Sequence, residues 1–248
     1  MEGNRSLLVY LSLNLILGVG LLWWNYSFPE LASLSDKYYK LWVFSSILAI
    51  LAYLDKNIRI LPAENMPLIG KASVPVVVAV SALVAVGLMY FQKTLTFSFI
   101  PLVAAGGERQ LLNIGASSAL IIFGWIIAVI ETDAFARTGQ NSIRELLAQL
   151  GVGDNNVALQ VRAVLFGAFH FILGAVNIPL IVGAYVFSLV SGYLNWRLGG
   201  FLPELLIHVI FNSYVIGIIF QLPFYVWILP PVITLLMLTK YSRYVRAI

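Results

Sequence analysis

Long apolar runs recur along the whole chain, and they restrict its fold more than any other feature. Each is close to the roughly 20 mostly apolar residues that a membrane-spanning helix needs. The expected spans cover about residues 6–25, 38–54, 73–92, 111–131, 160–176, 178–196, 201–220 and 223–240. The apolar positions are continuous rather than alternating, which argues against strands. We therefore expect an all-α, polytopic membrane bundle of about eight transmembrane helices.

Composition agrees with this class of protein. Only 10% of the 248 residues are charged, whereas soluble domains carry about 25%. Cysteine is absent, which excludes a disulfide framework and thiolate chemistry. The net charge of +4 is small, and the basic residues lie between apolar runs and at the C-terminus. That distribution is typical of membrane orientation and not of nucleic-acid binding, so the lipid bilayer is the expected partner and nucleic acid is not.

Lysine and arginine in the short loops predict the orientation. With eight spans both termini share one side of the membrane, and that side collects most of the 15 basic residues, Arg162 among them. Both termini are therefore expected in the cytoplasm. We expect one membrane domain, residues 1–248, with peripheral spans at 1–110, a functional core at 111–220, and a last span with a basic tail at 221–248.

Polar and glycine residues mark two of the connections. Asn141 and Ser142 are expected to cap a short amphipathic helix, Ile143–Leu150, that stops at Gly151. The pair Gly199–Gly200 is expected to separate the sixth and seventh spans.

The chain has two histidines, His170 and His208, and each lies inside an apolar run. An imidazole there cannot reach bulk water, so it needs a polar partner or a function. His208 and Asn212 are four residues apart and share a helix face, from which both can donate hydrogen bonds to an oxyanion. Phe166 and His170 are also four apart, and Phe166 would wall a dry pocket. His170 beside a carboxylate such as Glu131 could hold and deprotonate a water molecule.

The predicted topology places these residues at a similar depth in the membrane. Span four would run inward and end at Glu131, while spans five and seven would start in the cytoplasm. His170 and His208 would then lie about 12–15 Å along their helices from that side, at 1.5 Å per residue. We therefore expect a polar cavity open to the cytoplasmic side.

The motifs Phe166-x-x-x-His170 and His208-x-x-x-Asn212 resemble the second and third motifs of the CAAX protease and bacteriocin-processing family, also called the Abi family. The glycine-rich stretch between them is similar too, and the resemblance covers roughly Ala128 to Phe220. It implies an eight-helix, metal-independent intramembrane endopeptidase without a cofactor. It also implies that a glutamate and the first histidine position the water, while the second histidine and the asparagine hold the oxyanion. Eukaryotic relatives trim prenylated CAAX C-termini, so the implied partner is a peptide or protein tail, with or without a prenyl group.

The first family motif, Glu-Glu-x-x-x-Arg, is altered here. Aligned on Arg137, the two glutamates become Thr132 and Asp133, which keeps Asp133 and Arg137 at i,i+4 where they can pair. Aligned on Glu131, the second glutamate becomes Thr132 and the arginine becomes Ala136. Threonine is no base near neutral pH, so either Glu131 or Asp133 reaches the water or the protein hydrolyses poorly. The other interpretation of this cluster is interfacial charge at the end of a span.

Glu204 lies four residues before His208 and so shares its helix face. It could supply the missing base, or accept a proton from His208 and fix its tautomer. The third interpretation is a dipole partner at the start of a helix.

Other classes of function stay open from the sequence. Taken singly, an intramembrane histidine is often only a helix–helix hydrogen bond. The two histidines could instead bind zinc together with a carboxylate. They could also ligate a haem. The stronger rival is a catalytically impaired relative that acts as a membrane binding, scaffold or immunity protein.

Overall fold

The computed structural model describes residues 15–16, 18–27, 29, 69–70, 72–96, 114–172, 178–219 and 228–236. The regular secondary structure in these ranges is helical, so the all-α expectation is confirmed for this part of the chain. The helices are α3 (Val74–Thr96), α4 (Ile114–Thr132), the π-helix η3 (Asp133–Gly139), α5 (Gln140–Gln149), α6 (Asn155–Ile172), α7 (Ile178–Leu198) and α8 (Leu202–Ile219). Residues 18–27 and 228–236 are helical as well.

The helices can be compared with the predicted spans. Helices α3, α4, α6, α7 and α8 coincide to within about five residues with the predictions at 73–92, 111–131, 160–176, 178–196 and 201–220. The first and last predictions each overlap a helical segment, whereas 38–54 lies outside the described residues. Among the described residues, one helix is both long and apolar enough to cross a membrane, Val74–Phe91 with a mean hydropathy of 2.4. The number of spans stays a prediction.

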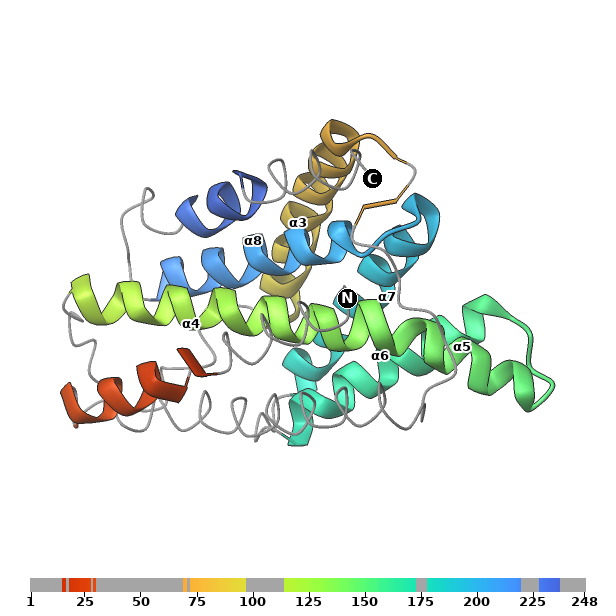
Figure 1. Cartoon of the computed structure of the whole chain (residues 1–248), viewed down its shortest axis with the longest axis horizontal. Coiled ribbons are helices and arrows are strands. Elements are labelled where there is room, and N and C mark those ends of the chain that lie inside the picture. The colour runs from red at the N-terminus through yellow and green to blue at the C-terminus, as the bar shows by residue number, and fades with distance from the viewer. Residues whose placement is uncertain are drawn as a thin grey trace, which may run out of the picture.

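Helices α4, η3 and α5 follow one another without a break, and Figure 1 shows them running on as one rod across the molecule. The junction residues Thr132, Gly139 and Gln140 all keep right-handed helical backbone angles. The predicted cap at Asn141 and Ser142 is therefore wrong. Helical turns precede α5 and offer carbonyl groups to its first N–H groups, so no capping side chain is needed.

Two helices end at glycines, as the sequence predicted. Gly151 has a φ of +81° and bonds its N–H to the carbonyl oxygen of Ala148 at 3.0 Å, while the next N–H bonds to that of Leu147 at 2.8 Å. This pair of bonds defines a Schellman motif, whose left-handed position favours glycine. Gly199, with a φ of +78°, ends α7 and bonds its N–H to the carbonyl oxygen of Asn195 at 2.8 Å.

Helix α8 lies at the centre of the packing. It packs along α4 and against α3, while α6 packs against α7, and Figure 1 shows α8 beside α4 with α3 crossing it. Residues 201–209 are all buried. The main apolar cluster joins Leu88 of α3, Phe166 of α6, Phe187 of α7 and Ile207 of α8. The first half of α8 thus keeps Glu204 and His208 away from the surface.

Candidate active site

The side chains of Glu131 and Thr132 both reach the imidazole of His208. Glu131 Oε2 lies 3.4 Å from His208 Nε2, and Thr132 Oγ1 lies 3.2 Å from His208 Nδ1. Glu131 and Thr132 are the last two residues of α4, and His208 lies within α8, which packs along α4. All three residues are buried. The carboxylate that reaches a histidine is thus Glu131.

These two partners define a consistent arrangement of protons on a neutral His208. A carboxylate can only accept a hydrogen bond, so we assign the N–H to Nε2, donating toward Glu131. Nδ1 then carries the lone pair and accepts the hydroxyl proton of Thr132. The 3.4 Å separation of His208 Nε2 from Glu131 exceeds the usual 2.7–3.2 Å of an N–H···O bond. The pair is therefore a close polar contact and not a normal hydrogen bond.

His170 has the opposite arrangement of ring protons. Its Nδ1 lies 2.9 Å from the carbonyl oxygen of Phe166, one helical turn earlier in α6. A carbonyl only accepts, so Nδ1 carries the hydrogen and Nε2 carries the lone pair. His170 is only partly buried. Its Nε2 is a proton acceptor near the end of α6.

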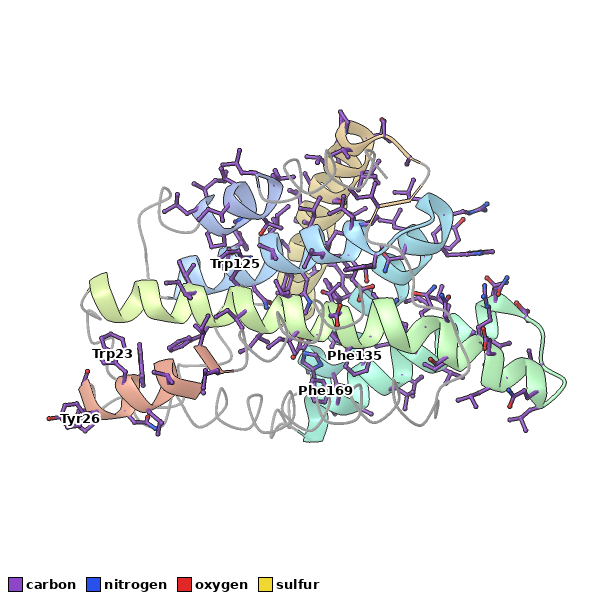
Figure 2. The ribbon with its side chains drawn as sticks, viewed as in Figure 1. Trp23, Tyr26, Trp125, Phe135 and Phe169 are labelled. Carbon is purple, nitrogen blue, oxygen red and sulfur yellow. The ribbon has the colours of Figure 1, made fainter. Side chains whose placement is uncertain are left out.

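Aromatic rings form the wall around the two imidazoles. The centroid of the Phe166 ring lies 4.7 Å from that of His170 and 6.2 Å from that of His208. Phe135 of η3 packs edge-on against Phe166 at 5.0 Å. Figure 2 shows Phe135 beside Phe169, and their centroids are 5.6 Å apart. Phe166 thus contacts both histidines, as expected of a pocket wall.

One cavity, here called the histidine cavity, joins the two histidines and the asparagine. Its lining includes Phe166, His170, Phe187, His208, Phe211 and Asn212. The space open to the centres of water molecules is about 60 Å³, which holds a few waters. Asn212 Nδ2 donates to the carbonyl oxygen of Gly124 in α4 at 3.3 Å. A carboxamide nitrogen has a second hydrogen to donate, so Asn212 keeps donor capacity for a bound group.

Asp133 and Arg137 lie in the π-helix. Asp133 opens η3 and is partly buried, and the side chain of Arg137 lies outside the described residues. The expected i,i+4 pairing assumed an α-helix. Hydrogen bonds in a π-helix run from i to i+5, which changes the residues that share a face. The pairing of Asp133 with Arg137 stays a prediction.

Glu204 has partners that the sequence did not suggest. It belongs to a buried polar hub, which we define as Arg162, Glu204, Asn195 and Gln140. Arg162 Nη2 donates to Glu204 Oε1, and Arg162 Nη1 donates to Gln140 Oε1 at 2.8 Å. Asn195 Nδ2 donates to Glu204 Oε2 at 2.6 Å. Both carboxylate oxygens of Glu204 thus have donors, and the arginine neutralises its charge. Glu204 thus forms an ion pair with Arg162, in place of the predicted roles as a base or as a partner of His208.

Sequence reasoning missed the hub, because it treated Arg162 as a basic residue of the cytoplasmic side. The available signal was its position inside the apolar run predicted at 160–176, where a charge needs an opposite charge. Arg162 has 0% exposure. A Cβ at Gly192 would overlap the Arg162 guanidinium, so glycine at that position makes room for it.

Comparisons with known proteins give no match to a protein-family model, a curated protein or a solved structure. Among the described residues, no group of three or more histidine, cysteine, aspartate or glutamate side chains is placed to hold a metal ion. The histidine cavity, at about 60 Å³, is far too small for a haem. The residues that come together are thus a carboxylate, two imidazoles and a carboxamide.

Proposed function

We propose that this chain is a multi-pass integral membrane protein of about eight spans with both termini in the cytoplasm. The low charge content and the long apolar runs support this proposal. So do the apolar side chains on the outside of α3, where Leu83 and Tyr90 are 74% and 72% exposed. Contiguous apolar surface of this kind is rarely left in water.

We further propose that it is an intramembrane endopeptidase similar to the CAAX protease and bacteriocin-processing family. The observation that carries this proposal is the Glu131–His208 contact at 3.4 Å, together with the cavity that His208 shares with His170 and Asn212. Carboxylate, imidazole and carboxamide groups that converge inside an apolar bundle are costly to bury, and they mark functional sites. The family resemblance supplies the reaction class.

The first step of the proposed reaction activates a water molecule. In the proposed first step a water molecule enters the histidine cavity, and the carboxylate of Glu131, which contacts the cavity-lining His208, takes one of its protons. The Nε2 lone pair of His170 accepts a hydrogen bond from the other hydrogen of the water. Its oxygen then attacks the carbonyl carbon of a peptide bond. The aromatic wall keeps bulk water away, which strengthens the electrostatic interactions inside the cavity.

The second step is the stabilisation and collapse of the tetrahedral intermediate. Asn212 donates its second amide hydrogen to the oxyanion, and the Nε2–H of His208 leaves Glu131 and donates a hydrogen bond to the same oxygen. The proton taken from the water passes to the leaving nitrogen as the C–N bond breaks. The products are a carboxylate and an amine, with no covalent intermediate. The substrate is a peptide or a protein C-terminal tail, with or without a prenyl group.

A second candidate function is a catalytically impaired membrane protein that binds, scaffolds or confers immunity. Two observations favour it. The histidine cavity of about 60 Å³ holds no peptide segment, and Thr132 lies 3.2 Å from His208 where the family resemblance expects a glutamate. In this alternative the histidines and Glu131 link α4, α6 and α8 without turning over a substrate.

Peptide cleavage tests the two candidates directly. The full-length protein, purified in detergent, is incubated with a prenylated CAAX-type peptide and a panel of unmodified peptides, and the products are identified by mass spectrometry. The peptidase proposal predicts cleavage that His170→Ala abolishes, with the variant still folded by circular dichroism. Cleavage that His170→Ala leaves intact would reject this site, and no cleavage of any peptide would favour the binding protein.

A further inference from the structure

A second cavity, here called the amide cavity, lies where α5, α6 and α7 meet, away from the histidines. Its volume, measured in the same way, is about 200 Å³, and its polar lining consists of Gln140, Asn141, Arg144, Asn155, Asn195 and Trp196. The floor is buried, with Gln140 at 9% and Asn195 at 0% exposure, while Arg144 and Trp196 are exposed at the rim. Neither the proposed reaction nor the family motifs use this cavity.

The buried hub determines the orientation of the side-chain amide of Gln140, a floor residue of the amide cavity. Arg162 can only donate hydrogen bonds, so the side-chain oxygen of Gln140 faces it at 2.8 Å and the NH₂ group points elsewhere. That NH₂ group has only a long bond, 3.5 Å, to the carbonyl oxygen of Gly192. Gln140 therefore has hydrogen-bonding capacity left for a ligand, and the ligand atom it would meet is an acceptor.

The charge of the lining is positive. The lining has four carboxamides and one guanidinium, that of Arg144, and no carboxylate. The nearby Glu204 is neutralised by Arg162, and Asp154 accepts the backbone N–H of Asn156 at 2.7 Å as the cap of α6. Donors with one cation and no acid favour an anion with several acceptor oxygens.

The surroundings of the rim suit a molecule with an anionic head and an apolar tail. Trp196 stacks with Arg197, whose guanidinium lies 5.5 Å from the indole centroid. The apolar side chains of Leu146 in α5 and Val157 in α6 are exposed. Tryptophan and arginine next to exposed apolar side chains are typical of the level of lipid headgroups, and basic pockets between helices on that side bind phosphorylated headgroups.

We propose that the amide cavity binds a phosphate-bearing anion, with Arg144 at the rim and Gln140 at the floor as donors. The phosphate comes from an anionic phospholipid headgroup or from free phosphate in the cytosol. The lipid source rests on the proposed insertion in a membrane. Anion binding itself is independent of the proposed peptidase activity, so either proposal can fail without the other.

Thermal unfolding with added ligand tests the proposal. The full-length protein in a neutral detergent is titrated with inorganic phosphate, with dihexanoyl phosphatidic acid, and with dihexanoyl phosphatidylcholine, and unfolding is followed by tryptophan fluorescence. The anions are expected to raise the melting temperature, and Arg144→Gln is expected to weaken binding about tenfold because a charged hydrogen bond is lost. Arg144→Lys is the matched control, since it keeps a positive charge and a donor at the rim and should keep most of the binding.

The outcomes separate the sources and can overturn the proposal. A shift with phosphatidic acid but not with phosphate assigns the lipid headgroup, and equal shifts with both assign free phosphate. No shift with either anion, an equal shift with phosphatidylcholine, or equal losses in Arg144→Gln and Arg144→Lys would overturn it. Ala158→Leu keeps every charge but fills part of the floor, so unchanged binding by this variant would also overturn it.

Discussion

Two buried polar centres lie one helical turn apart on α8, and they are built in opposite ways. In the hub, Glu204 accepts a hydrogen bond from Asn195 at 2.6 Å and pairs with Arg162. The side chains of Glu204 and Arg162 are at most 1% exposed. At the histidine site, His208 has contacts of 3.2 and 3.4 Å beside a cavity and an aromatic wall. The hub is held by short, charge-assisted hydrogen bonds, whereas the contacts of His208 are longer.

One bundle thus combines a rigid polar centre with a centre whose protons can be exchanged. The hub joins α6, α7, α8 and the start of α5 through buried hydrogen bonds and an ion pair, so it fixes these helices relative to one another. The long bonds of His208 cost little to break, which suits a group that must change partners during a reaction. A site of this kind depends on a rigid shell around it.

The largest expected effect is on turnover. Glu131→Gln should lower the rate of peptide cleavage by about 10²–10⁴-fold, because the amide cannot accept the proton of the attacking water. The melting temperature should change little, since glutamine is isosteric and still contacts His208. Cleavage kinetics and thermal unfolding in detergent measure the two quantities.

The matched control for this change is Glu145→Gln on α5, which should keep full turnover. A Glu131→Gln protein that cleaves at the wild-type rate would remove Glu131 from the proposed reaction and leave the hub as the better-supported of the two centres.

Substitutions in the hub should instead change the free energy of unfolding. Arg162→Met should reduce the free energy of unfolding by about 3–5 kcal/mol, because it leaves the Glu204 carboxylate buried without its cation. The double variant Arg162→Met, Glu204→Leu should recover most of that loss. Unfolding by SDS in mixed micelles, followed by tryptophan fluorescence, gives both values. A double variant as unstable as the single one would show that packing, and not charge, holds the hub.

Two glycine substitutions compare the packing of the two centres. Gly192→Ala should destabilise by about 1–3 kcal/mol, because its Cβ would overlap the Arg162 guanidinium and lie 2.6 Å from Leu159 Cδ1. Gly167→Ala, one residue after Phe166, should cost less, since its nearest contact is the Ile181 carbonyl oxygen at 3.3 Å. The same unfolding assay ranks them, and the reverse order would contradict the contrast in packing.

The smallest effect is expected at Thr132. Thr132→Val keeps the shape of the side chain but removes the hydroxyl that donates to His208 Nδ1, which should cost about 1 kcal/mol. Nδ1 is then able to hold the proton, and ¹⁵N NMR of the labelled histidine would detect the changed tautomer. Spectra identical to those of the wild type would refute our assignment of the ring protons.

The helices and part of the site were predictable, because their signals are local. Continuous apolar runs located α3, α4, α6, α7 and α8, and i,i+4 spacing placed Phe166 beside His170. The π-helix was not predictable, since nothing in Asp133–Gly139 distinguishes it from an α-helix before Phe135 packs on Phe166. The hub was not predictable either, because Arg162 and Glu204 are 42 residues apart and only the packing of α6 on its neighbours brings them together.

The rod of α4, η3 and α5 is also a continuous helical connection between Glu131 and the amide cavity. At 1.5 Å per residue an α-helix of this length would extend roughly 50 Å, well beyond the roughly 30 Å of a bilayer core. Its middle carries Glu131, and its far end carries Gln140 and Arg144 of the amide cavity. A torque applied to α5 by a bound molecule would reach the Glu131–His208 contact through the same backbone. The π-helix η3 lies between α4 and α5, so a rotation of α5 would reach α4 only through η3.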